Sequence, residues 1–344
     1  MKKIALLMSG GIDSSYSAYI LKKDYEVSGI YLKLHNKEEK HKFFIEKCNI
    51  VSKNLNINFE ILDLQNEFRE IVYKYFVDSY KNAKTPNPCA MCNPNIKFGL
   101  ALEAALKRGF DYIASGHYAR IKNINGINYI QEALDKSKDQ SYFLFGISKV
   151  AKDRLLFPLG DKLKSEVKKE AFSAMSWFGE LEEYKDSQEI CFVDKDYIST
   201  INKDINVEEK GFIKDKLGNI IGEHKGYMQY TIGKRKGLNI PLSQTPKYVI
   251  DINANDNVVV VGDKNDLIKK EIIANIISLD NFKNGIYNIK IRYKSKSIRA
   301  EIKIIDNKIF AYPLESVYGV ANGQALVIYK DDIVLGGGFI LDSK

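Results

Sequence analysis

The chain has 344 residues, more than one typical domain holds, which predicts two or three domains that each bury a core. It is 45% hydrophobic and 28% charged, and no stretch is apolar enough to span a membrane, so an integral membrane protein is excluded. A net charge of +8 favours a polyanionic partner, although abundant Lys and Asn can also reflect codon composition.

The first half of the chain alternates predicted strands and helices. A buried strand over residues 3–8 starts almost at once and leaves no room for a signal or transit peptide, so a cytoplasmic location is expected. Apolar residues from Ile12 to Ile20 then recur at helical spacing. Further strands are predicted at 27–32, 58–62 and 111–115, and further helices at 39–55, at 65–81 and from Asn93-Pro94 to 109. This alternation predicts an α/β fold with a doubly wound parallel sheet.

From about residue 211 the pattern becomes β-rich, with short runs separated by Asn, Asp and Gly turns. The runs lie at 248–252, 258–261, 286–293, 298–305, 309–313, 325–329 and 333–340. Their spacing predicts small antiparallel barrels, and the polar stretch 198–210 is the expected link. We therefore predict a catalytic domain over 1–197, a small β-rich linking domain over 198–265 and a C-terminal antiparallel β-barrel over 266–344.

The segment SGGIDSS, residues 9–15, lies between the first strand and the first helix. Two glycines allow a tight turn that presents N–H groups to a phosphate, and the serine hydroxyls and the helix N-terminus add to the site. The pattern is neither the P-loop nor the dinucleotide GxGxxG motif. A plain strand-to-helix turn is the alternative, but the position after a buried strand favours a nucleotide site. Asp13 is expected to position magnesium or the reacting groups, with helix capping as the alternative.

SGGIDSS resembles the pyrophosphate loop of the ATP pyrophosphatases, which adenylate an oxygen, release pyrophosphate and let a nucleophile displace AMP. GMP synthetase, argininosuccinate synthetase, tRNA lysidine synthetase and the tRNA thiolases share the loop, so it does not choose among them. The resemblance implies that Leu32 packs on adenine, where a core residue would look identical, and that Gly116 contacts ATP. The implied ATP-binding residues are Leu7, Met8, Ser9, Gly10, Gly11, Ile12, Asp13, Ser14, Leu32 and Gly116.

Four cysteines in a cytosolic chain are expected to be reduced thiols, which favours catalysis or metal binding. Cys89 and Cys92 lie in TPNPCAMCN, directly ahead of the predicted helix, whose N-terminus should lower a thiol pKa. Cys191 lies in the motif DSQEICF. Cys48, mid-helix and without polar neighbours, is expected to be a core residue, and burial in the core is the alternative for the others.

TPNPxxxCNxxIKF and DSxxICF closely resemble the two cysteine motifs of the tRNA 2-thiouridylase family. By this resemblance Cys92 is the catalytic nucleophile and Cys191 carries a transferable persulfide, with a disulfide between them as the spent form. Many relatives have Asp where this chain has Cys89. Cys89, Cys92 and Cys191 together would offer three ligands for a [4Fe–4S] cluster, which stays open beside the pure persulfide route; a zinc site is less attractive.

Other stretches resemble tRNA-contacting motifs of the same family. The implied tRNA-contacting residues are Asn87, Pro88, Cys89, His117, Lys138, Asp139, Gln140, Arg292, Tyr293 and Gln324. The basic, glycine-rich and aromatic segments 222–226 and 230–238 are expected to bind phosphates and stack on bases. A structural histidine at 117, a polar turn at 138–144 and a charged surface hairpin at 222–238 are the alternatives.

The resemblance covers Met1 to about Leu341 and implies a tRNA-uridine 2-sulfurtransferase that uses ATP and Mg²⁺ to activate O2 of the wobble uridine. The expected partners are tRNAs for Lys, Glu and Gln and a cysteine desulfurase or sulfur-relay protein, with no membrane. The segment Lys33 to His41 is shorter than in many relatives, which leaves open any sulfur-receiving role of the longer loop. An ATP pyrophosphatase-type ligase for a small molecule and a non-enzymatic nucleotide and RNA binder are the rival hypotheses.

Overall fold

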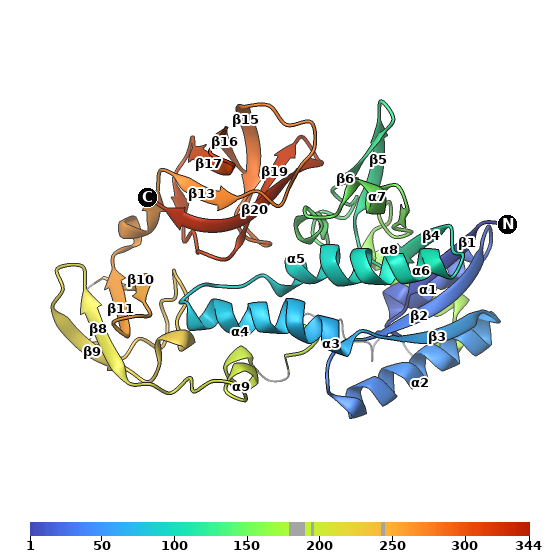
Figure 1. Cartoon of the computed structure of the whole chain (residues 1–344), viewed down its shortest axis with the longest axis horizontal. Coiled ribbons are helices and arrows are strands. Elements are labelled where there is room, and N and C mark those ends of the chain that lie inside the picture. The colour runs from blue at the N-terminus through green and yellow to red at the C-terminus, as the bar shows by residue number, and fades with distance from the viewer. Residues whose placement is uncertain (179–189, 194–195, 242–244) are drawn as a thin grey trace. The chain divides into compact units, whose positions relative to one another are not determined.

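The computed structural model describes residues 1–178, 190–193, 196–241 and 245–344 (Figure 1). They form two compact units that exchange segments. The first unit contains Met1–Val72, Cys89–Gln188 and Lys330–Leu335, and the second contains Tyr73–Pro88, Glu189–Tyr329 and Gly336–Lys344. Within these described ranges, no helix has both the length and the apolar character needed to cross a membrane.

A five-stranded parallel sheet forms the centre of the first unit, in the order β3-β2-β1-β4-β7. Its strands are β1 (Lys3–Leu7), β2 (Glu26–Lys33), β3 (Asn58–Asp63), β4 (Tyr112–Ser115) and β7 (Leu155–Leu156). Ile4 and Leu6 of β1 are fully buried beneath α1 (Ile12–Leu21) and α2 (Glu38–Leu55), which confirms the predicted α/β class. The strand order reverses between β1 and β4, so the loops that follow these two strands adjoin where such sheets bind ligands.

Two long helical runs of the first half contain a widened, π-helical turn. The run over 65–81 consists of α3 (Gln65–Phe68), η1 (Arg69–Tyr73) and α4 (Lys74–Lys81). The other consists of α5 (Pro88–Cys92), η2 (Asn93–Leu100) and α6 (Ala101–Lys107). The prediction that Asn93-Pro94 opens this helix was wrong, because helical structure already begins at Pro88. Pro94 lacks the N–H that would bond the carbonyl four residues earlier, which is consistent with the wider turn there.

A hairpin that the sequence did not predict follows the fourth strand. It consists of β5 (Arg120–Ile124) and β6 (Ile127–Gln131), and Gln131 pairs with Ile333 at the start of β20. Among its described residues, the first unit also has the helical elements η3 (Ser141–Phe143), α7 (Lys149–Lys152), α8 (Lys164–Ala174) and η4 (Ser176–Phe178). Val167 and Ala171 of α8 pack in a core cluster with Ile12 and Tyr16 of α1. This packing brings the start of α8 to the helix that follows SGGIDSS.

The second unit contains a small sheet and a closed barrel. The sheet has the order β10-β11-β8-β9, formed by β8 (Gly211–Asp215), β9 (Ile220–His224), β10 (Tyr248–Asn253) and β11 (Val258–Gly262). Because β11 and β8 run parallel, it is mixed rather than antiparallel as predicted. α9 (Tyr197–Ile201) precedes it, and η6 (Tyr227–Gln229) and η7 (Lys264–Leu267) follow β9 and β11.

The barrel confirms the predicted C-terminal antiparallel architecture. Its strands, in order around the barrel, are β13 (Ile272–Asn275), β17 (Lys308–Pro313), β16 (Ile298–Ile305), β15 (Gly285–Lys290), β19 (Ala325–Lys330) and β20 (Ile333–Ser343). Pairing of β13 with β20 closes it. The short strands β12 (Ile268–Lys269), β14 (Ser278–Leu279) and β18 (Val317–Tyr318) complete the second unit. β15 ends at Lys290, so Arg292 and Tyr293 follow the strand instead of belonging to it as predicted.

Candidate active site

The SGGIDSS segment forms a tight turn after β1 at Ser9, Gly10 and Gly11, and its last four residues form the first turn of α1. Gly10 has a φ of +70°, and a Cβ built there would lie 2.7 Å from the Lys47 Cβ, so a side chain at this position would need both an unfavourable backbone and extra space. The hydroxyls of Ser14 and Ser15 donate to the Gly11 carbonyl at 3.0 and 2.9 Å. In this structure these two hydroxyls therefore brace the turn, and a phosphate would find its donors in the backbone N–H groups and the start of α1.

Asp13, in the first turn of α1, is held by two side chains that the sequence analysis did not single out. Lys164 Nζ lies 2.6 Å from Oδ1 and 2.7 Å from Oδ2 of Asp13. The Tyr118 hydroxyl donates to Asp13 Oδ1 at 3.0 Å. The carboxylate is therefore paired with an ammonium and has a further hydrogen bond, instead of standing alone at the loop.

Gly116, the implied ATP contact after β4, lies against the start of α1. A Cβ built on Gly116 would be 3.0 Å from the Asp13 carbonyl carbon and 3.1 Å from Ser14 N. Any side chain would push on backbone atoms of the first turn, which cannot move aside alone. The close approach gives a physical reason for glycine here, and it puts Gly116 beside the first turn of α1.

His117 is a half-buried, neutral imidazole. Its Nδ1 forms a 2.7 Å hydrogen bond with the Ser115 hydroxyl, and its ring packs against Phe98 and Phe157. Burial, with a smaller effect from nearby Lys97, holds the pKa of His117 well below its usual range. His117 therefore contributes no positive charge near neutral pH, and its expected tRNA contact would have to use a neutral ring.

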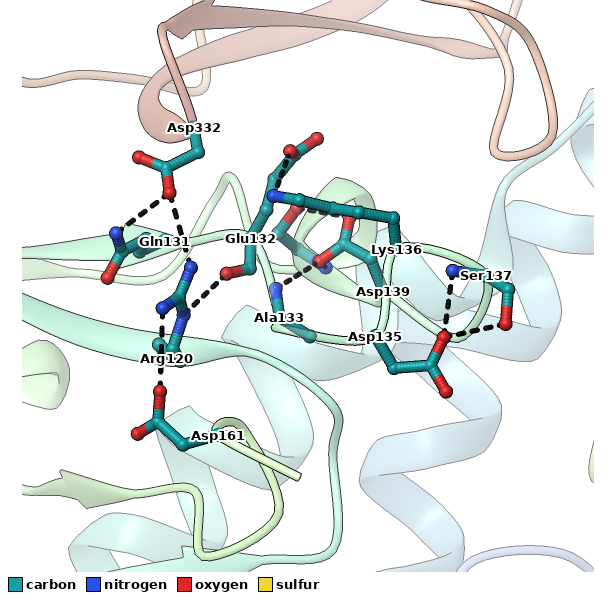
Figure 2. Close-up of polar contacts among 11 residues, drawn as sticks. Arg120, Gln131, Glu132, Ala133, Asp135, Lys136, Ser137, Asp139, Asp161 and Asp332 are labelled. Atoms are coloured by element: carbon teal, nitrogen blue, oxygen red, sulfur yellow. Dashed lines mark hydrogen bonds and ion pairs between the residues drawn. The ribbon is translucent and has the colours of Figure 1, made fainter. Parts of the chain in front are cut away.

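Asp139 is the internal brace of the loop over 133–141 (Figure 2). It is only 5% exposed, and it accepts hydrogen bonds from Ala133 N and Ser141 N on Oδ1 and from the Ser141 hydroxyl on Oδ2. Burial raises the pKa of this carboxyl. Such a side chain supports from within the loop that is implied to contact tRNA, whereas its neighbour Lys138 is half-buried and closer to solvent.

Gln140 connects this loop to the residue that contacts Asp13. The backbone N–H of Gln140 donates to the Tyr118 carbonyl at 2.8 Å, and Tyr118 N donates to Gln140 Oε1 at 2.9 Å. The loop is also tied to α8, because Lys164 N donates to Asp135 Oδ2 at 3.0 Å. The implied tRNA motif 138–140 and the phosphate loop are thus joined by short hydrogen-bonded steps within one unit.

In the second unit, the residues implied to contact tRNA near the cysteine motif converge with Gln324. Gln324 Nε2 donates to the carbonyls of Thr85 at 3.2 Å and Pro86 at 3.0 Å. Thr85 N donates in turn to the Asn322 carbonyl at 2.8 Å. The buried Asn87 is held on this segment too, since its backbone N–H lies 3.2 Å from the Tyr75 hydroxyl. Gln324 therefore fixes the chain that leads into Pro88.

The cysteines differ in environment. Cys89 lies in the first turn of α5 and is half-buried, Cys92 lies one turn later and is buried, and Cys191 is exposed in the second unit. Because the helix begins at Pro88, its N-terminal field acts first on Cys89 and less on Cys92 than the sequence suggested. Cys48 is fully buried in the core, where desolvation raises its pKa to about 12. Residues Asp186 to Glu189 of the second cysteine motif lie outside the described residues.

Two histidines, His35 and His41, stabilise the short segment after Leu32. His41 Nε2 donates to the His35 carbonyl at 2.5 Å, and the Tyr31 hydroxyl lies 2.8 Å from His41 Nδ1. The two imidazoles stack with their centroids 4.2 Å apart. Burial, followed by the charge of His41, lowers the pKa of His35 to about 4. The Leu32 side chain, just before this segment, is partly exposed at the end of β2.

Comparisons with known proteins agree over the entire chain. Residues 2–195 match a family model described as the tRNA methyl transferase HUP domain, 198–263 the tRNA methyl transferase PRC-barrel domain, and 269–340 the aminomethyltransferase beta-barrel domain. A Helicobacter hepaticus protein named tRNA-specific 2-thiouridylase MnmA is 52% identical over 344 residues, covering 99% of this chain and 100% of that protein. The chain belongs to the tRNA-specific 2-thiouridylase family.

Other members with the same name support the assignment. The Helicobacter pylori protein is 53% identical over 341 residues, covering 98% of this chain and all of its own length. The Nitratiruptor sp. protein is 46% identical over 344 residues, covering 99% of both chains. The family models are described by methyl and aminomethyl transfer, whereas every one of these full-length relatives is named a 2-thiouridylase, so the name of the relatives decides the family.

For this 2-thiouridylase family member, the structure adds Tyr118 and Lys164 to the residues that the sequence singled out. Tyr118 stands directly after Gly116 and His117, so its place near a strand end was a signal. No sequence motif marks Lys164, because it looks like any other lysine at the start of a charged helix. Its role at Asp13 depends on packing between α1 and α8, 151 positions apart in sequence.

Proposed function

We propose that the chain is an ATP-dependent tRNA 2-thiouridylase, which adenylates O2 of a uridine and replaces that oxygen with sulfur. The observation that carries the proposal is the identity of 52–53% over essentially the whole chain with proteins of that name. A phosphate loop between β1 and α1, at the switch point of a parallel sheet, supports the ATP-dependent step. A ligase for a small molecule would need neither the barrel nor the paired cysteine motifs, so this alternative is not favoured.

In the proposed reaction, the loop 9–15 and Gly116 hold the triphosphate while uridine O2 attacks the α-phosphate and pyrophosphate leaves. The terminal sulfur of a persulfide on Cys191 then attacks C2 and displaces AMP. The Cys92 thiolate attacks the remaining sulfur–sulfur bond at the Cys191 Sγ, which releases 2-thiouridine and forms a Cys92–Cys191 disulfide. Two electrons from an external thiol reduce this disulfide.

Of the two implied inorganic groups, magnesium fits poorly at the residue expected to position it. Asp13 was expected to position Mg²⁺, but both of its carboxylate oxygens are bound by Lys164 and one also by Tyr118. The three cysteines of the implied iron–sulfur cluster belong to different units, Cys89 and Cys92 to the first and Cys191 to the second. The proposed reaction is therefore written as the persulfide route, and the cluster stays the alternative to it.

The proposed substrates are the tRNAs for Lys, Glu and Gln, modified at the wobble uridine, and the proposed sulfur source is a cysteine desulfurase or a relay protein. Arg292, Tyr293, Gln324, Asn87, Pro88 and Cys89, with His117 and residues 138–140, are the proposed tRNA contacts. The exposed position of Cys191 supports its role as the sulfur acceptor, because a donor protein must reach the thiol.

Nucleoside mass spectrometry tests the function directly. Purified protein, ATP, cysteine, a cysteine desulfurase and unmodified tRNA should yield 2-thiouridine and one pyrophosphate per modified base. A strain lacking the gene should lose the modification from the same tRNAs and regain it with the wild-type gene. Normal 2-thiouridine in the deletion strain, together with no product in the purified system, would refute the function.

A further inference from the structure

We propose that Lys164 is the cation that complements the triphosphate of ATP, and that Asp13 holds this lysine in place instead of acting as a metal ligand. The inference rests on the proposed ATP-dependent function and assigns a residue that no sequence motif marks. It follows from three features of the first unit: the loop composition, the burial of Lys164 and the way its position is fixed.

The phosphate loop carries no cation of its own. Residues 9–15 contain no Lys, Arg or His, and the loop offers only backbone N–H groups and the partial charge of a helix N-terminus. The acidic Asp13 in the same turn would repel a polyphosphate if its charge were not balanced. A nearby ammonium both cancels that charge and attracts the anion. Lys164, at 2.6 and 2.7 Å from the Asp13 oxygens, is the cation found there.

The ion pair is buried on one side and open on the other. Lys164 is 7% exposed, while the Asp13 side chain keeps 32% of its surface. Burial of an ammonium is unfavourable unless its hydrogen-bonding partners are fixed. A lysine that served only at the protein surface would not need to be buried. The Asp13 carboxylate therefore keeps contact with solvent, from which a phosphate would arrive, while the Lys164 side chain is buried.

Neighbouring elements set the position of the ammonium. Lys164 is the first residue of α8, and its backbone N–H is bound by Asp135 Oδ2 at 3.0 Å. The ammonium lies over the Tyr118 ring, 5.5 Å from its centroid. The Tyr118 hydroxyl donates to Asp13 Oδ1, one of the two oxygens that the ammonium also contacts. Asp13 and Tyr118 thus act as positioning residues, and Lys164 is the group proposed to touch substrate.

Equilibrium binding of radiolabelled ATP, measured without tRNA, tests the proposal. Lys164→Met should weaken ATP binding about 10- to 100-fold, the effect of losing a hydrogen bond to a charged group. Lys164→Arg, which keeps the charge, should recover most of the affinity. Asp13→Asn should weaken binding less than Lys164→Met, because the lysine remains. Lys162→Met is the matched control, since this nearby lysine pairs with Glu170 at 2.8 Å instead of Asp13.

The double variant Asp13→Asn/Lys164→Met separates a functional lysine from a structural ion pair. It removes both charges, so thermal unfolding should return towards the wild-type temperature, whereas ATP binding should stay as weak as in Lys164→Met. Wild-type ATP affinity in the double variant, or a larger loss in Asp13→Asn than in Lys164→Met, would overturn the proposal. The proposed function is tested separately by thiolation with the wild-type protein, so failure of one leaves the other measurable.

Discussion

Arg292 Nη2 donates a hydrogen bond to the backbone carbonyl of Ile232, 3.1 Å away. This contact joins the implied tRNA-binding residue after β15 to the basic segment 230–238 within the second unit. In that segment Lys234 donates to the Gln229 carbonyl at 2.7 Å and lies over the Tyr230 ring, and its burial lowers its pKa. Arg235 and Lys236 are exposed.

The exposed pair should provide most of the salt-dependent tRNA binding of this segment. Arg235→Ala/Lys236→Ala should lower the slope of log affinity against log salt by about one to two units, because each phosphate contact releases condensed counterions. Filter binding of tRNA at several salt concentrations measures the slope. The exposed lysines 107 and 169 of the first unit provide a matched double-alanine control. An unchanged slope in the Arg235/Lys236 variant would make the segment ordinary surface.

Substitution of Cys89, Cys92 and Cys191 should affect thiolation differently, according to the role of each cysteine. Cys92→Ser and Cys191→Ser should each abolish 2-thiouridine formation, because one removes the attacking thiolate and the other the persulfide carrier. Cys89→Ser should leave thiolation nearly unchanged if the persulfide route operates alone. Cys48→Ala is the control, since Cys48 lies in the core and its loss should cost stability without stopping the reaction.

Iron analysis of anaerobically purified protein distinguishes the iron–sulfur cluster from the pure persulfide route. About four irons per chain, with loss of both iron and activity in Cys89→Ser, would establish a [4Fe–4S] centre and contradict the metal-free reaction. Iron-free, active protein would exclude it. Loss of activity in Cys89→Ser without any iron would instead make Cys89 a resolving thiol, as its place one turn before Cys92 allows.

Asp139 should matter for stability more than its place in a tRNA motif suggests. Asp139→Ala leaves Ala133 N and the Ser141 donors without their acceptor and should lower the free energy of unfolding by about 2–3 kcal/mol. Lys136→Ala, in the same loop but exposed, should change it by less than about 0.5 kcal/mol. Urea denaturation measures both. Equal stability of Asp139→Ala and wild type would mean that the loop does not depend on this carboxylate.

His35 should make the protein sensitive to acid. Its pKa is about 4 in the folded protein, against an ordinary value of 6.5 for an exposed histidine, so between these values the unfolded chain binds a proton that the folded chain does not. Stability from this group is therefore present above pH 6.5 and is lost as the pH falls towards 4. His35→Asn should reduce the drop in urea midpoint between about pH 7 and pH 4.5, whereas Asn36→Ala, the exposed neighbour, should keep it. The same drop in both variants would refute the assignment.

The parallel sheet and the barrel were predictable because their signals are local. Buried runs such as residues 3–8 and the Asn, Asp and Gly turns after residue 211 report burial and chain reversal directly. The phosphate loop was predictable for the same reason, since two glycines after a buried strand already restrict the backbone. The start of the helix at Pro88 was missed because Asn93-Pro94 imitates a helix start, and Pro94 is instead accommodated by a widened turn.

The candidate site was predictable only where its residues lie in short motifs. Lys164 was missed because its meaning comes from the packing of α8 on α1, and no residue near it in the sequence indicates a partner at Asp13. The bracing role of Asp139 was missed for a comparable reason. Residues 138–144 can be read as a polar turn, whereas the loop closes around Asp139 and its carboxylate accepts from Ala133 and Ser141 of the same loop.

The exchange of segments between the two units has a consequence for synthesis on the ribosome. The first unit includes Lys330–Leu335, where Asp332 binds Arg120 at 3.2 Å and Gln131 at 2.9 Å (Figure 2). Asp332 follows Arg120 and Gln131 by roughly 200 residues in the sequence. At a translation rate of about 5–20 residues per second, the hairpin β5–β6 is therefore synthesised about 10–40 s before Asp332. A fragment that stops near residue 197 would always lack this carboxylate. The catalytic unit is therefore finished only when nearly the whole chain has been translated.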